Sequence, residues 1–67
     1  MNIYINNAIK NLPDNIDTLG KVVDFLNIPR KGTGIAVNGK LVKAADWDKI
    51  NIKNEDHLTI ISATYGG

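Results

Sequence analysis

The first and last regular segments of the chain alternate between apolar and polar residues. Residues 1–6 are apolar at every odd position, and residues 57–62 read His-Leu-Thr-Ile-Ile-Ser. A period of two with β-branched side chains predicts strands with one buried face. The residues expected on the buried faces are Ile3, Ile5, Leu58 and Ile60, and those expected to face outward are Tyr4, Thr59 and Ile61.

One segment between these strands changes to a helical period. Apolar side chains recur at i, i+3, i+4 and i+7 over residues 19–26, which predicts a helix with one apolar face. Thr18 is placed to cap its start, and Pro29 is expected to stop it. Gly20 costs the helix about 1 kcal/mol relative to Ala, which close packing against the sheet would explain. The basic pair at residues 30–31 is expected to be solvated near the end of the helix.

Two asparagine-containing turns predict hairpins on either side of this helix. Asn6-Asn7 separates the first strand from a strand at 8–12, and Asn38-Gly39 separates short strands at 35–37 and 40–42. Trp47, in a polar setting, is expected to cover the core. The order predicts an α+β fold with a mixed sheet of four to five strands and one main helix packed across it.

Composition narrows the function classes further. The 67 residues include no cysteine and one histidine, His57, and the net charge is +1. We therefore expect no bound metal or cofactor, no nucleic-acid footprint and no enzymatic nucleophile, with His57 an ordinary strand residue. Apolar runs are far shorter than the ~20 residues that span a bilayer, and no signal peptide follows Met1, so we expect a soluble cytoplasmic protein.

The last five residues carry the candidate chemistry. Ala63-Thr64-Tyr65 lead into Gly66-Gly67, and we expect them to form a flexible tail (63–67) on a domain of residues 1–62. The terminal carboxylate is ionised at neutral pH and must be activated before a nucleophile can attack it. Attack of the carboxylate on the α-phosphate of ATP would give such an activated acyl-adenylate. Two glycines make a thin segment that can enter a partner's channel.

In order and spacing, these features resemble the ThiS family of sulfur carriers, which have the ubiquitin-like β-grasp fold. The resemblance rests on the segment 1–6, the capped helix, the segment 36–42, Trp47 and the Gly-Gly end. It implies a ThiF-like enzyme that consumes ATP to adenylate the C-terminal carboxylate. A sulfur donor protein would then form a thiocarboxylate, which gives its sulfur to a ThiG-like thiazole synthase for the thiazole of thiamin. The reactive position would be Gly67, with Gly66 giving access and Ala63, Thr64 and Tyr65 lying in the partner's channel.

Other functions of a β-grasp chain with this ending remain open at this point. The small subunit of molybdopterin synthase shares the tail but usually has a proline before it, and this chain has none there. A ubiquitin-like modifier would use the same carboxylate, whereas a non-reactive binding module would not need Gly-Gly. Glu55 stands where the family often has glycine, which implies a slightly different turn. Tyr4, Thr59 and Ile61 are our hypothesis for the partner interface.

Overall fold

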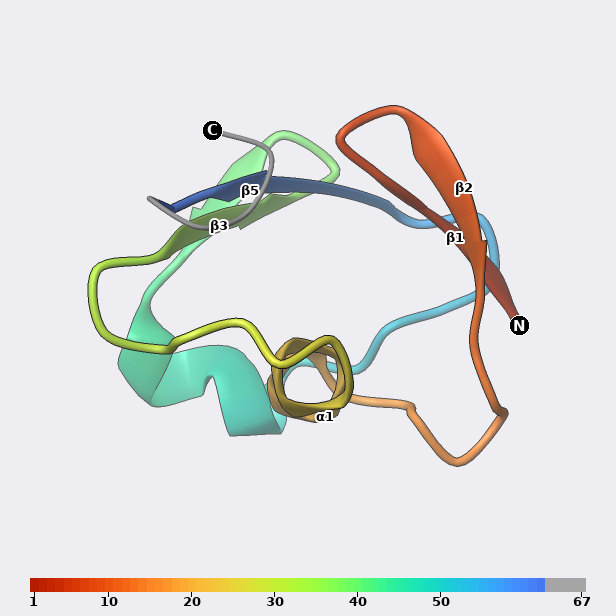
Figure 1. Cartoon of the computed structure of the whole chain (residues 1–67), viewed down its shortest axis with the longest axis horizontal. Helices are drawn as coiled ribbons and strands as arrows, with labels where there is room; N and C mark the ends of the chain where they lie inside the picture. Colours follow the sequence, from red (N-terminus) through yellow and green to blue (C-terminus); the bar gives the residue numbers. More distant parts are fainter. Residues whose placement is uncertain (63–67) are drawn as a thin grey trace.

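The computed structural model describes residues 1–62, which form one mixed sheet with a helix across one of its faces (Figure 1). The strands lie in the order β2-β1-β5-β3-β4. The central strand β5 runs parallel to its neighbour β1, although the two come from opposite ends of this region. The elements are β1 (Asn2–Ile5), β2 (Ala8–Asn11), α1 (Leu19–Phe25), β3 (Gly34–Val37), β4 (Lys40–Val42), the 3-10 helix η1 (Ala44–Lys49) and β5 (His57–Ile61). The predicted α+β architecture is therefore confirmed.

Both predicted hairpins form around left-handed residues. Asn6 and Asn7, with φ of 51° and 71°, join β1 to antiparallel β2. Asn38 and Gly39, with φ of 49° and 84°, join β3 to β4. Positive φ at both central residues is the type I′ requirement, which explains why asparagine and glycine occupy these positions. Strand β2 ends at Asn11, one residue before the predicted end.

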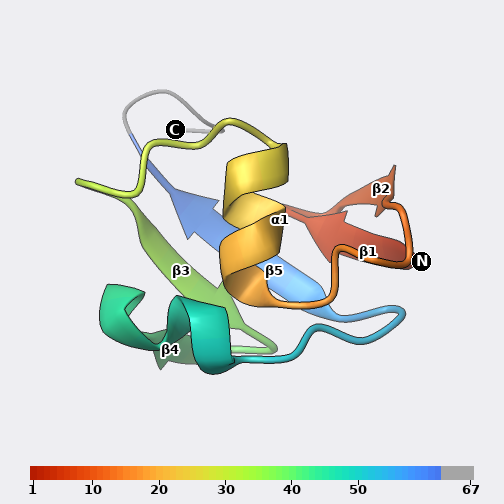
Figure 2. The same ribbon diagram turned by 90° about the horizontal axis from the view of Figure 1, so that it is seen from below.

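The core lies between the sheet and the layer formed by α1 and η1 (Figure 2). The predicted inward residues of β1 and β5 are all buried, so the predicted faces of these strands are confirmed. Trp47 is fully buried as expected, and its indole N–H donates to the carbonyl of Val42 at 3.0 Å. That bond satisfies the polar end of an otherwise apolar side chain.

Helix α1 starts as predicted but ends earlier. The hydroxyl of Thr18 accepts a hydrogen bond from the backbone N–H of Lys21, which confirms the predicted cap. The helix ends at Phe25, and Asn27 follows with φ of 57°. The N–H groups of Asn27 and Ile28 donate to the carbonyls of Asp24 and Val23, the Schellman pattern. The prediction that Pro29 stops the helix was wrong, because the left-handed Asn27 has already ended it.

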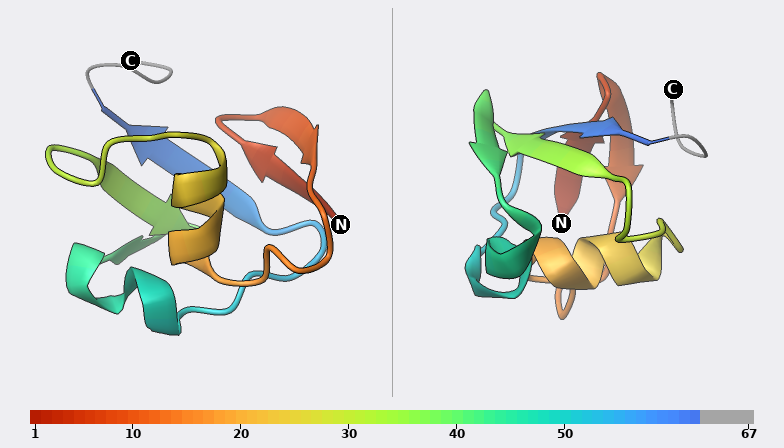
Figure 3. Two further views of the ribbon diagram at one scale, coloured as in Figure 1. Left: turned by 60° about the horizontal axis from the view of Figure 1, so that its bottom comes forward. Right: turned by 90° about the vertical axis from the view of Figure 1, so that its left-hand side faces the viewer.

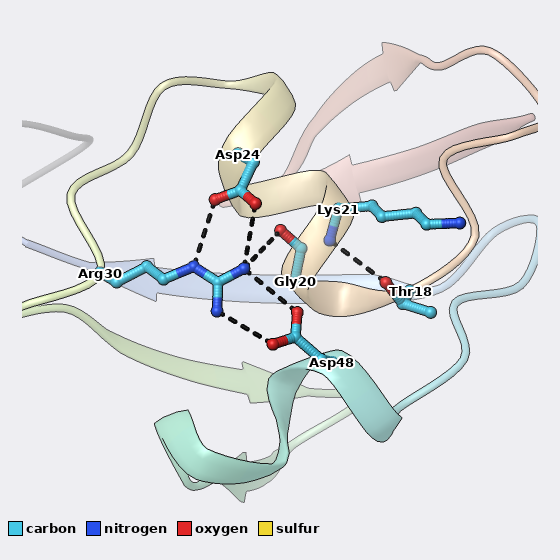
Figure 4. A network of polar contacts seen from close by, with 6 residues as sticks. All are labelled: Thr18, Gly20, Lys21, Asp24, Arg30 and Asp48. Carbon is cyan, nitrogen blue, oxygen red and sulfur yellow. Dashed lines mark hydrogen bonds and ion pairs between the residues drawn. The ribbon is translucent and has the colours of Figure 1, made fainter.

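A polar network accounts for Gly20 and corrects two predictions (Figure 4). The guanidinium of Arg30 contacts the carboxylates of Asp24 and Asp48, at 3.0 and 3.1 Å, and also donates to the carbonyl of Gly20. It also lies 6.0 Å from the ring centroid of Trp47. Arg30 is thus not a simply solvated charge, although Lys31 is exposed as expected. A Cβ at Gly20 would overlap the Asp48 carboxylate, so Gly20 packs against η1 rather than against the sheet.

The same contacts shift two pKa values in opposite directions. Hydrogen bonds from Arg30 lower the pKa of Asp48 below its ordinary value of 3.8. Hydrogen bonds to Asp48 and then Asp24 raise the pKa of Arg30. The network links α1, the loop after it and η1 (Figure 4).

Candidate functional site

The outward face of the sheet carries most of the large apolar side chains exposed in residues 1–62. Ile9, Leu41 and Ile61 lie on this face and are 63, 79 and 69% exposed. Pairing places Ile9 beside Tyr4, and it places Leu41 beside Ala36, which in turn neighbours Thr59. We call this surface the outward face: Tyr4, Ile9, Ala36, Leu41, His57, Thr59 and Ile61. Its apolar side chains come from all five strands, so the fold assembles a surface that no single segment contains.

An aromatic pair lies on this face between β1 and β5. The rings of Tyr4 and His57 stack with centroids 4.3 Å apart and an interplanar angle of 11°. The pair follows from the parallel register, which places the two residues side by side. Tyr4 is consequently half-buried rather than freely exposed, and His57 has a specific partner that the sequence interpretation did not anticipate. The stacking covers one face of each ring.

The predicted site residues divide into two groups. Tyr4, Thr59 and Ile61 share the outward face, as expected. Strand β5, blue in Figure 3, ends at Ile61. The other five predicted residues lie outside the part of the chain that the structure describes: Ala63, Thr64, Tyr65, Gly66 and Gly67. The outward face therefore extends to within two positions of the segment that carries the terminal carboxylate.

Sequence reasoning missed a side chain that holds β5 near its end. The amide of Asn6 accepts a hydrogen bond from the N–H of Ile60 at 2.8 Å and donates to its carbonyl at 3.1 Å. The only sequence signal was the pair of asparagines in the first turn, which indicated backbone conformation and not this contact. Asn6 therefore joins the first hairpin to the strand that leads into the candidate site.

The described part of the chain lacks three other kinds of feature. Residues 1–62 contain no group of three or more His, Cys, Asp or Glu side chains placed to hold a metal ion. The same residues enclose no pocket, and none of their helices is long and apolar enough to cross a membrane. What the region does offer is an exposed surface with apolar side chains and a half-buried aromatic, a composition suited to contact with another protein.

Comparisons with known proteins agree with the fold. The model of the ThiS family matches residues 2–67. The crystal structure of a thiamine biosynthesis protein (ThiS) from Geobacter metallireducens is similar, with a TM-score of 0.82 and 16% identity over the full length of both chains. An NMR structure of a thiamine biosynthesis protein from the same organism has a TM-score of 0.79 and 16% identity, covering all of this chain and 88% of the other. No curated protein sequence matches. At this identity the two structures support the β-grasp fold alone.

Proposed function

The chain belongs to the ThiS family, sulfur carriers of thiamine biosynthesis that act as non-catalytic co-substrates, and from this premise we propose how it carries sulfur. A ThiF-like enzyme directs an oxygen of the Gly67 carboxylate onto the α-phosphorus of ATP, and pyrophosphate leaves. Sulfide-level sulfur from a donor protein then attacks the acyl carbon, AMP leaves, and the terminus becomes a thiocarboxylate. A ThiG-like thiazole synthase takes the sulfur for the thiazole of thiamin.

The observation that carries this proposal is the extent of the family match. It runs to residue 67 and so includes the final Gly66-Gly67. The proposed adenylation requires that the carrier has an accessible carboxylate and a surface that the activating enzyme recognises. Residues 1–62 would form the folded body that presents residues 63–67, the last two of them glycine.

We assign the recognition surface to the outward face. Ile61 and Thr59 lie on β5 directly before the reactive segment, and Ile61 is 69% exposed. An enzyme that binds Gly67 in its active site must also cover the part of the outward face next to the end of β5. Burial of aliphatic side chains there would stabilise the complex, with Tyr4 as an aromatic contact. The lining of the enzyme's channel would contact Ala63, Thr64 and Tyr65.

Ile61→Asp tests this surface, with Phe25→Asp as a matched control. Both residues are exposed hydrophobics, but Phe25 lies on α1, in the other layer. A charge at position 61 must be desolvated in the complex, so we expect at least about a tenfold rise in the KM for the carrier in ATP-dependent pyrophosphate release. The control should stay within about twofold of wild type, because it lies off the face.

The results separate the parts of the proposal. Equal KM values for the two variants would contradict the assignment of the outward face. A wild-type chain that supports no more pyrophosphate release than a chain lacking Gly66-Gly67 would contradict the proposed chemistry itself. Circular dichroism of both variants establishes that a change in KM does not come from unfolding.

A further inference from the structure

The Asn6 amide continues the parallel pairing of β1 and β5 after the backbone of β1 has turned away. The N–H groups of Tyr4 and Asn6 donate to the carbonyls of Asp56 and Leu58, at 2.9 Å each. In a regular parallel ladder, the next carbonyl of β5, at Ile60, would accept from residue 8. Residue 8 already belongs to β2, so the side-chain amide of Asn6 bonds to Ile60 instead.

Both backbone groups of Ile60 depend on this one side chain. The N–H and the carbonyl of a strand residue point to the same side of the strand, and for Ile60 that side is occupied by Asn6. Ile60 is 1% exposed, so water cannot readily replace the amide. Unpaired backbone groups at a buried position are unfavourable. Without Asn6, the end of β5 would keep its backbone pairing with β3 and lose its hydrogen bonds on the β1 side.

The backbone of Asn6 makes the arrangement possible. Its φ of 51° lies in the left-handed region, which asparagine tolerates better than most residues. The turn therefore needs a residue such as Asn or Gly at this position, and only Asn also supplies an amide that both donates and accepts. The tolerance of positive φ serves the hairpin, and the side-chain amide serves β5.

We propose that Asn6 is a positioning residue for the reaction at the C-terminal carboxylate. It holds β5 at Ile60, seven residues before Gly67, and so fixes the strand from which the reactive segment starts. The inference rests on the proposed carrier function. The outward face would still dock without Asn6, but a larger share of the docked complexes would place the segment unproductively. Loss of Asn6 therefore lowers kcat, whereas loss of Ile61 raises KM.

Asn6→Gly removes the amide without disturbing the turn, and Asn7→Gly is the matched control. Both residues have positive φ and are neighbours in the same turn, so glycine has the same backbone effects at each. Each lost hydrogen bond increases the population of the state in which the end of β5 is detached by roughly fivefold. We expect the amide hydrogen of Ile60 to exchange on the order of 20-fold faster in Asn6→Gly only.

The activity readout distinguishes positioning from stability. For Asn6→Gly we expect kcat for ATP-dependent pyrophosphate release with the activating enzyme to fall about fivefold, with KM within about twofold, since contacts with the enzyme restore part of the order. Asn6→Asp keeps the hydrogen-bond acceptor but loses the donor, so its kcat should also fall. This variant replaces Asn6→Gly in the experiment if Asn6→Gly does not fold.

Two results would overturn the inference, and they differ. Faster exchange at Ile60 with kcat and KM equal to those of Asn7→Gly would mean that Asn6 serves the fold alone. Absence of adenylation in the wild-type chain would refute the proposed function, and the role of Asn6 would fail with it.

Discussion

Gly20→Ala should not stabilise this protein, although alanine normally stabilises a helix. Gly20 lies in the first turn of α1, where replacing glycine would ordinarily gain up to about 1 kcal/mol. Here the added Cβ would overlap the Asp48 carboxylate and lie 3.1 Å from Nη2 of Arg30. The carboxylate must move away from its position and so lose its contact with Arg30.

The expected magnitude follows from these opposing effects. Displacing the carboxylate costs up to about 1 kcal/mol, because the pair that it forms with Arg30 lies on an exposed surface. Set against the helix gain, the free energy of unfolding should stay nearly unchanged, with a Tm within about 3 °C of wild type. In an Asp48→Ala background the obstructing carboxylate is absent, so Gly20→Ala should instead stabilise the fold by up to about 1 kcal/mol. The coupling between the two sites is then about 1 kcal/mol.

Thermal and urea unfolding of the four proteins in this double-mutant cycle provides the measurement. Gly20→Ala should raise the Tm only when Asp48 is removed. An equal increase in Tm in both backgrounds would refute the reasoning, because it would mean that Asp48 does not occupy the space beside Gly20.

Two further predictions concern stability. Glu55 has φ of 69°, which glycine adopts more easily, so Glu55→Gly should raise the free energy of unfolding by about 0.5–1 kcal/mol; no gain in urea unfolding would contradict this. The folded-state pKa of Asp48 is lowered, so its pairing with Arg30 stabilises the fold above about pH 4 and is lost as the pH falls through the lowered pKa. Wild type should therefore lose more stability than Asp48→Asn in acid, and parallel pH curves would contradict that expectation.

The features predicted best from the sequence are those decided by local pattern. Alternation in β1 and β5 fixed which side chains face the core, because a strand's side-chain period allows only two arrangements. The asparagine turns and the Thr18 cap were predictable because backbone preference and capping chemistry act over two to four residues. Glu55 shows how far such a rule extends: a left-handed turn forms there without the glycine that usually favours it.

The features that were missed depend on residues far apart in the chain. Arg30 meets Asp48 across 18 positions, and Asn6 meets Ile60 across 54, so no local pattern indicates either contact. The end of α1 was misplaced because Pro29 is a strong signal, whereas the left-handed Asn27 is a weak one. The stacking of Tyr4 on His57 likewise required the parallel register of β1 and β5.

The intact mass of the chain after reaction with its activating enzyme, ATP and sulfur donor tests the central claim most directly. Replacement of one carboxylate oxygen by sulfur has nearly the same nominal mass as oxidation of Met1 to the sulfoxide, so fragmentation must locate the gain. The proposed function predicts that it maps to Gly67 and that the product reacts with a thiol alkylator. A plain carboxylate at Gly67, while the same enzyme preparation modifies a second carrier, would contradict the claim.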